Sequence, residues 1–147
     1  MANPSENERK RGKAEIVDAE NFIRLLDLEV KRGRRYQNYF CMLLFKVKRY
    51  GTPAVNAPQV FVYYKMVNLL AEEIRESDVI GSPDDHCIAV ILPYGDPVAG
   101  EKARKRIEET LKYYEFKKIG YEVRVDLVCF PQNGSDTTEL MKIIKRI

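Results

Sequence analysis

An α/β domain, with a mixed sheet flanked by helices, is the fold that this sequence predicts. Segments in which apolar residues recur every three or four positions alternate along the chain with shorter runs rich in Val, Ile and Leu. The 147 residues suit one domain, and a hydrophobic content of 45% is enough for a substantial core. The predicted order is helix, strand, helix, hairpin, helix, strand, helix.

The first half of the chain contains two predicted helices and one predicted strand. From Asp18 onward apolar residues follow helical spacing, and arginines supply cations near the predicted C-terminus of this helix. Residues 40–45 form an apolar run that changes to alternation over residues 46–48, as in a central strand that emerges into solvent. Gly and Pro break the pattern between residues 51 and 58, and a second helix is predicted to end near Arg75. Its predicted apolar face contains Val60, Tyr63, Tyr64, Val67, Leu70 and Ile74.

A hairpin and a third helix follow. Val79–Gly81 and Cys87–Leu92 are predicted strands, and the polar segment Ser82–Asp85 is predicted to be the exposed turn between them. Asp96–Pro97 is a good N-cap and first-turn pair, so the third helix is predicted to start there and to run through Leu111.

The C-terminal part adds one strand and one helix. Apolar and charged residues alternate over Val123–Leu127, which predicts a strand with one buried face. Asp136 and Glu139 resemble a capping box, so the last helix is predicted to follow them.

Composition and charge exclude several classes of function. The net charge of +3 is too small to indicate nucleic-acid binding. Residues 1–17 are predicted to be a flexible charged tail without a function of its own, so the domain is predicted at residues 18–147. No apolar run is long enough to cross a bilayer and no apolar signal core is present, so we expect no membrane span and a cytoplasmic location. The three cysteines stand among apolar residues, so we expect buried, reduced thiols.

Several short segments are similar, in their order and spacing, to those of a known family. They are Leu28-Glu29, Lys31, Arg34-Arg35-Tyr36, Leu70-Ala71, Arg75-Glu76-Ser77-Asp78, Ala89-Val90-Ile91-Leu92-Pro93, Lys102-Ala103, Arg106-Ile107, Phe130-Pro131 and Asn133-Gly134. Together they resemble a GGDEF (diguanylate cyclase) domain over nearly the whole chain from about Asp18, with a slightly shortened segment around residues 51–58. The resemblance implies a nucleotidyl-cyclase-like mixed sheet with a ferredoxin-like core.

The positions of the family's signature hold different residues in this chain. Of the five positions, only the apolar last one is kept in kind. In the family, paired glycines let the backbone approach the nucleotide, whereas aspartates at these positions repel a triphosphate. The five signature positions fall on Asp84, Asp85, His86, Cys87 and Ile88.

The family's metal site is also replaced. It requires one carboxylate from the end of the first strand and one from the signature, because hard divalent cations need oxygen ligands. These two positions hold Lys46 and Cys87, and a further position that is often Asp holds Lys48. The polar residues that help to read guanine have no equivalent in the shortened segment. The resemblance therefore implies a degenerate domain that is not an enzyme, with no cofactor and no bound Mg²⁺.

One family motif is kept. Arg75-Glu76-Ser77-Asp78 matches the RxxD motif of the family's inhibitory site and stands five residues before the signature positions, as in the family. The resemblance implies that Arg75, Asp78 and Arg106 bind cyclic di-GMP. A guanidinium can fork onto a phosphate or the O6/N7 edge of guanine, and a carboxylate accepts hydrogen bonds from guanine N1 and N2.

An alternative stays open at this stage. Arg75 and Asp78 are also residue types that ordinarily cap a helix end or lie in solvent. The domain is then a ligand-independent module for protein–protein interaction or dimerisation in bacterial signalling, with a protein partner or a second copy docked on the old active face. That face carries Lys46, Lys48, Asp84 and Asp85.

Other chemistry is less well supported. Residues 84–87 include metal-ligand types, but neighbours in a strand face opposite sides and do not converge on one ion. The adjacent His86 and Cys87 fail as a base and a nucleophile for the same reason. Aromatic residues at helical spacing in the second helix are predicted to belong to the core rather than to a docking patch. They are Phe61, Tyr63 and Tyr64.

Overall fold

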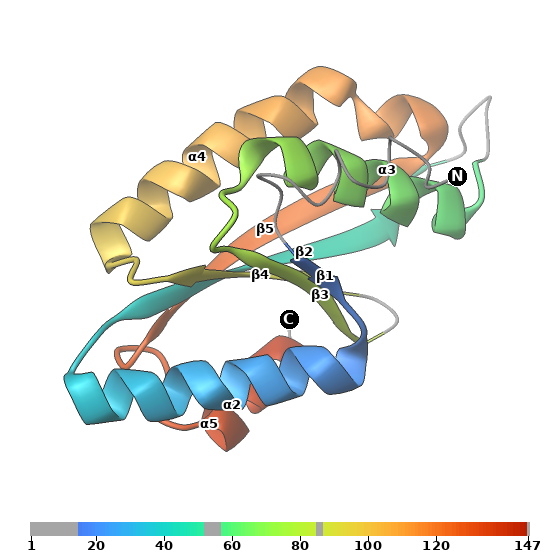
Figure 1. Cartoon of the computed structure of the whole chain (residues 1–147). Coiled ribbons are helices and arrows are strands. Elements are labelled where there is room, and N and C mark those ends of the chain that lie inside the picture. Colours follow the sequence, from blue (N-terminus) through green and yellow to red (C-terminus); the bar gives the residue numbers. More distant parts are fainter. Residues whose placement is uncertain (1–14, 52–56, 85–86, 147) are drawn as a thin grey trace, which may run out of the picture.

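The computed structural model describes residues 15–51, 57–84 and 87–146 (Figure 1). Within these residues five strands form one sheet, in the order β1-β3-β4-β2-β5. The elements are β1 (Glu15–Val17), α2 (Ala19–Tyr36), β2 (Phe40–Arg49), α3 (Gln59–Glu73), β3 (Val79–Asp84), β4 (Cys87–Pro93), α4 (Pro97–Tyr114), the 3-10 helix η1 (Phe116–Ile119), β5 (Tyr121–Phe130) and α5 (Thr137–Arg146).

The sheet is mixed, as the sequence predicts. β1 runs parallel to β3, whereas β3, β4, β2 and β5 pair in antiparallel fashion. The succession β2-α3-β3-β4-α4-β5, with the strand order β3-β4-β2-β5, is a ferredoxin-like core. The predicted fold class is therefore confirmed.

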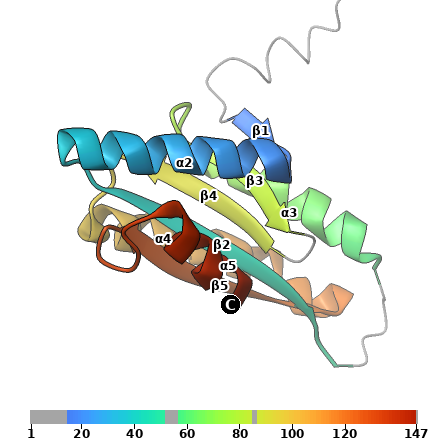
Figure 2. The ribbon, with the colours of Figure 1, turned by 90° about the horizontal axis from the view of Figure 1, so that it is seen from below.

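Helices cover both faces of the sheet. α3 and α4 lie on one face and α2 and α5 on the other (Figures 1 and 2). The side chains of successive β2 residues point alternately to these two faces. Leu43 and Phe45 belong to the core under α3 and α4, and Met42 and Leu44 belong to the core under α2 and α5. A central strand with two buried faces explains why residues 40–45 are apolar without alternation. No helix among the described residues has the length and apolar character that crossing a bilayer requires.

The predicted boundary of the N-terminal tail is wrong by three residues. Glu15, Ile16 and Val17 form β1 and pair with Val79, Ile80 and Gly81 of β3. A strand this short carries too little periodicity to be recognised, and its partner lies more than sixty residues away along the chain. The rest of the predicted tail lies outside the described residues.

The predicted hairpin turn starts too early. β3 continues through Asp84, which is paired with Cys87 of β4, and an irregularity lies between Gly81 and Asp84. The Ser82 hydroxyl lies 2.6 Å from the carbonyl oxygen of Asp84 and 3.0 Å from that of Cys87, so it bridges the two strands. Turn-forming residues are tolerated here because a bulge takes them out of the regular ladder. The connection itself lies outside the described residues.

The buried face of α3 also differs from the predicted one. Val60 is 79% exposed, and Phe61 and Tyr64 are exposed as well, so their predicted place in the core is wrong. Tyr63 is half-buried and packs against the core, as predicted. Apolar residues occupy most sides of this helix, and spacing alone therefore does not single out the buried face. The buried residues of α3 are Val62, Met66 and Leu70.

The predicted helix starts agree with the structure. Asp96 accepts a hydrogen bond from the backbone N–H of Ala99 (2.8 Å), with Pro97 in the first turn of α4. Asp136 likewise accepts from the N–H of Glu139 (2.8 Å) before α5. β5 is longer than predicted at both ends, and η1 was not predicted.

Candidate functional site

Lys46 and Cys87 face each other across β2 and β4. They are direct partners in the antiparallel register, so their side chains lie on the same face of the sheet. Cys87 is fully buried in the core under α2 and α5. Burial, helped by the nearby charge of Asp84, raises the pKa of the Cys87 thiol to about 12, so the thiol is protonated at neutral pH.

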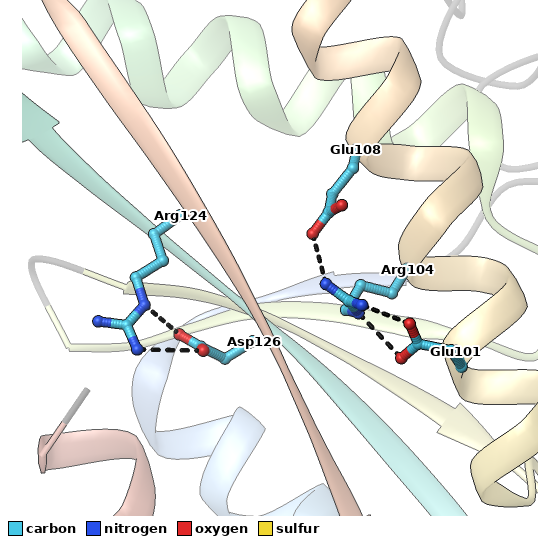
Figure 3. A network of polar contacts seen from close by, with 5 residues as sticks. All are labelled: Glu101, Arg104, Glu108, Arg124 and Asp126. Carbon is cyan, nitrogen blue, oxygen red and sulfur yellow. Dashed lines mark hydrogen bonds and ion pairs between the residues drawn. The ribbon is translucent and has the colours of Figure 1, made fainter.

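This pair does not fit the Mg²⁺ site of the family that the chain resembles. An ammonium group repels a divalent cation, and a protonated thiol is a poor ligand for Mg²⁺, which requires oxygen donors. A carboxylate does lie on the same face, at Asp126 of β5, but Arg124 holds it with an Nε–Oδ2 distance of 3.1 Å (Figure 3). In the described parts of the chain, no three acidic, histidine or cysteine side chains are grouped so that they could hold a metal. The donor groups at these positions therefore do not suit a divalent cation.

Of the four other signature positions, Asp84 and Ile88 belong to the residues that the structure describes. Asp84 is half-buried at the end of β3, and Ile88 is buried in the core under α3 and α4. Asp85 and His86 lie outside the described residues.

Arg75 and Asp78 lie in the connection between α3 and β3. α3 ends at Glu73, so Arg75 is beyond the helix rather than in its last turn. Asp78 is only 6% exposed, and its Oδ2 accepts a hydrogen bond from the backbone N–H of Arg75 at 2.7 Å. The Asp78 N–H in turn donates to the Arg75 carbonyl oxygen at 3.0 Å. The carboxylate thus closes the turn that leads into β3.

Arg106 of α4 reaches the same place from another element. Its Nη2 donates to the Glu73 carbonyl oxygen at 3.2 Å, and its Nε lies 3.7 Å from a carboxylate oxygen of Glu73. Burial raises the pKa of Asp78, against the lowering effect of the Arg75 N–H and of the Arg75 and Arg106 charges. The structure therefore brings the three predicted ligand-binding residues into one cluster.

The cluster has two exposed cations beside one buried carboxylate. The side chains of Arg75 and Arg106 are exposed, so an anion from solvent can reach both guanidinium groups, and that of Arg106 also contacts Glu73. Glu73 was missed by sequence reasoning, because its contact with Arg106 joins residues 33 positions apart, and no local pattern marks it. Chemically, the cluster suits a ligand that combines phosphate groups with hydrogen-bond donors.

No protein-family model and no curated protein matches this chain. Solved structures do match it. A DGC protein from Thermotoga maritima has a TM-score of 0.74 at 15% sequence identity, covering 90% of this chain and 95% of that one. For the GGDEF domain of FimX from Pseudomonas aeruginosa the TM-score is 0.70 at 12% identity, with 89% and 85% covered.

A third match is the GGDEF domain of DgcB from Caulobacter crescentus, solved in complex with c-di-GMP. Its TM-score is 0.63 at 10% identity, with 90% of this chain and 81% of that one covered. At identities this low the shared property is the three-dimensional arrangement of the elements. This chain has the fold of the GGDEF diguanylate cyclase domains.

Proposed function

We propose that this protein is a catalytically inactive GGDEF-fold domain that acts as a regulatory module in signalling. The pairing of Lys46 with the buried thiol of Cys87 carries this proposal. A cyclase of this fold would need carboxylates at these two places to hold the metal on the triphosphate of GTP. An ammonium group and a protonated thiol cannot replace them, so GTP is not turned over.

The ligand that best suits the retained site is cyclic di-GMP, bound by Arg75, Asp78 and Arg106. Two exposed guanidinium groups beside the Asp78 carboxylate match the two phosphates and the guanine edges of this molecule. The hydrogen bond from the Arg75 N–H fixes the carboxylate in place before a ligand arrives, which reduces the entropy lost on binding. The mechanism is sensing rather than catalysis.

Calorimetric titration tests both parts of this proposal. Cyclic di-GMP should bind the wild type, whereas Arg75→Ala and Arg106→Ala should each weaken binding by about tenfold or more, since each removes a charge-assisted contact. Arg35→Ala is the matched control, because Arg35 is an exposed arginine on the separate helix α2. GTP with Mg²⁺ should give no heat. Equal cyclic di-GMP binding by all four proteins would overturn the site, and GTP binding would overturn the inactive assignment.

A ligand-independent interaction module is the second candidate. It is favoured by the observation that Asp78 is already bonded to Arg75 N–H and Arg106 to Glu73, so the cluster is satisfied as a structural device. In this case the protein would bind a partner through other surfaces, and cyclic di-GMP would give no heat with the wild type. The absence of binding heat with cyclic di-GMP would therefore support the interaction module over the cyclic di-GMP sensor.

A further inference from the structure

The outer edge of β5 is unpaired in the part of the chain that the structure describes. β5 is the last strand in the sheet order and has ten residues, Tyr121–Phe130, all of them paired with β2 on the inner side only (Figure 2). The opposite edge of the sheet is formed by the three residues of β1. A long edge strand presents a row of backbone donors and acceptors to a further strand.

Two hydrogen bonds show which backbone groups of β5 point outward. The N–H of Tyr50 donates to the carbonyl oxygen of Gly120 at 2.9 Å, so every second residue after Gly120 bonds to β2. The residues between them, including Val123, Val125 and Leu127, therefore direct their N–H and C=O groups away from the sheet. Cys129 also directs its backbone groups away from the sheet, and its N–H is already bonded to Asn133 Oδ1 at 2.7 Å.

The available edge is therefore centred on Val125. At one end of this edge Asn133 occupies the N–H of Cys129, and at the other end η1 packs beside β5 near Tyr121. Between these limits lie Val123, Val125 and Leu127, which are only half-buried.

A hollow opens on the α4 side of this edge. It has a volume of about 480 Å³ and lies between the C-terminal half of α4, η1 and β5, with Val123 and Val125 in its wall. A strand added beside β5 would direct every second side chain to this side of the sheet. The hollow thus offers room for apolar side chains of the added strand.

The other face of β5 carries alternating charges at Glu122, Arg124 and Asp126. Arg124 and Asp126 are paired within the chain, at Nε–Oδ2 3.1 Å. Among the charged side chains of α4 near this strand, Arg104 donates to Glu101 and to Glu108, and all three come from the opposite side of the sheet (Figure 3). They do not compete for Arg124 or Asp126.

We propose that β5 pairs in antiparallel fashion with β5 of a second copy of this chain, with Val125 opposite Val125 of the second copy. This register places Arg124 opposite Asp126 of the second copy, and the same pair recurs by the two-fold symmetry. It also places Val123 opposite Leu127 of the second copy, on the side of the hollow. Outward-pointing backbone groups then meet outward-pointing groups along the ladder.

Charge and the limits of the available edge together select this register against its neighbours. A shift that centres the pairing on Arg124 sets arginine opposite arginine and Asp126 opposite Glu122 of the second copy, which is repulsive. A shift that centres it on Val123 sets Arg124 opposite Glu122 of the second copy, which charge allows, but it also sets Val125 opposite Tyr121, where η1 limits the ladder. Electrostatic complementarity of this kind fixes register and partner choice.

Charge reversal tests the register directly. Arg124→Asp should raise the dimer dissociation constant by about tenfold or more, because acidic side chains then face each other twice, and Asp126→Arg should do the same with two arginines. An equimolar mixture of these two variants should recover the wild-type dissociation constant, since each then meets its opposite charge. Sedimentation equilibrium measures all four samples. Dimers of the single variants that are as tight as the wild type, or a mixture that stays monomeric, would overturn the register.

Val125→Pro tests the use of the edge itself. The N–H of Val125 points away from β2, so proline removes an outward donor and leaves the ladder between β2 and β5 intact. The variant should keep the circular dichroism spectrum of the wild type and sediment as a monomer. The wild-type chain must dimerise at high protein concentration. A monomeric wild type, or a folded Val125→Pro variant that still dimerises, would refute the proposal.

Discussion

The carboxylate of Asp78 combines burial with a hydrogen bond from the Arg75 N–H and with two nearby arginine charges. Burial has the largest effect and raises the pKa of Asp78 above its ordinary value. A raised pKa in the folded state means that folding favours the protonated form. The contribution of this group to stability is thus fully present below the ordinary pKa of aspartate, and it is lost as the pH rises through the folded-state pKa.

Two substitutions at Asp78 separate its charge from its hydrogen bond. Asp78→Ala should lower the free energy of unfolding by about 1–2 kcal/mol, because the Arg75 N–H loses its acceptor. Asp78→Asn keeps an acceptor and removes a buried charge, so it should be at least as stable as the wild type at neutral pH. Its advantage should shrink when the pH is lowered from neutral to acidic, because the wild-type carboxyl, whose pKa is raised by burial, then takes up a proton. Urea unfolding at both pH values measures this, and an Asn variant as unstable as the Ala variant would contradict it.

Individual residues of the site were predictable only where the order and spacing of short sequence segments mark them. Lys46 and Cys87 were assigned to the metal positions from segment order, and the register of β2 and β4 places them opposite each other. Glu73 and Asp126 were not assigned. The role of Glu73 depends on its contact with Arg106 of α4, and that of Asp126 on its pairing with Arg124 on the same face of β5. Such contacts follow from tertiary packing and leave no local pattern.

Among the elements, α2 depends on a close approach to β3. A Cβ atom at Gly81 would lie 2.5 Å from the ring carbon Cδ2 of Phe22 and 2.9 Å from its Cβ. Phe22 is fully buried, so it has little freedom to move away. Glycine at this position therefore permits the helix to lie directly on the strand.

Gly81→Ala should lower the free energy of unfolding by about 1–3 kcal/mol, as expected for overpacking. The cost should fall when Phe22 is also replaced by the smaller leucine, because the two residues are in direct contact. Urea unfolding of the wild type, both single variants and the double variant gives the coupling energy. Additive effects of the two substitutions would show that the clash with Phe22 is not the cause.

Helices and strands were predicted correctly where a periodic sequence pattern extends over many residues, and were missed or cut short where the pattern covers few residues or is ambiguous. α2, β2 and α4 each contain ten or more residues with a clear pattern or cap, and they lie where the sequence predicts them. β1 has three residues and depends on pairing with β3, which no local signal reports. The predicted β3 ends too early because Ser82–Asp84 have the composition of a turn, whereas a bulge accommodates them in the strand and the Ser82 hydroxyl bonds to the carbonyl oxygens of Asp84 and Cys87.

At the scale of the whole molecule, one sheet separates two apolar cores. Ile107 of α4 is buried in the core under α3 and α4, and Ile144 of α5 is buried in the core under α2 and α5. Both cores contain residues of β2 and β4, so neither helical layer can be removed without exposing the other side of the same strands. This arrangement favours one cooperative unfolding transition over independent melting of the two layers.

Matched truncations in the two cores test this cooperativity. Ile107→Val and Ile144→Val each remove one buried methylene group, and each should cost about 0.5–1.5 kcal/mol of unfolding free energy. Because the two side chains lie on opposite faces of the sheet, the double variant should show the sum of the two losses. Differential scanning calorimetry should record a single transition in all variants. If Ile144→Val instead split off an earlier transition while the main one stayed in place, α2 and α5 would form a separately unfolding layer, and only the ferredoxin-like core would behave as one cooperative unit.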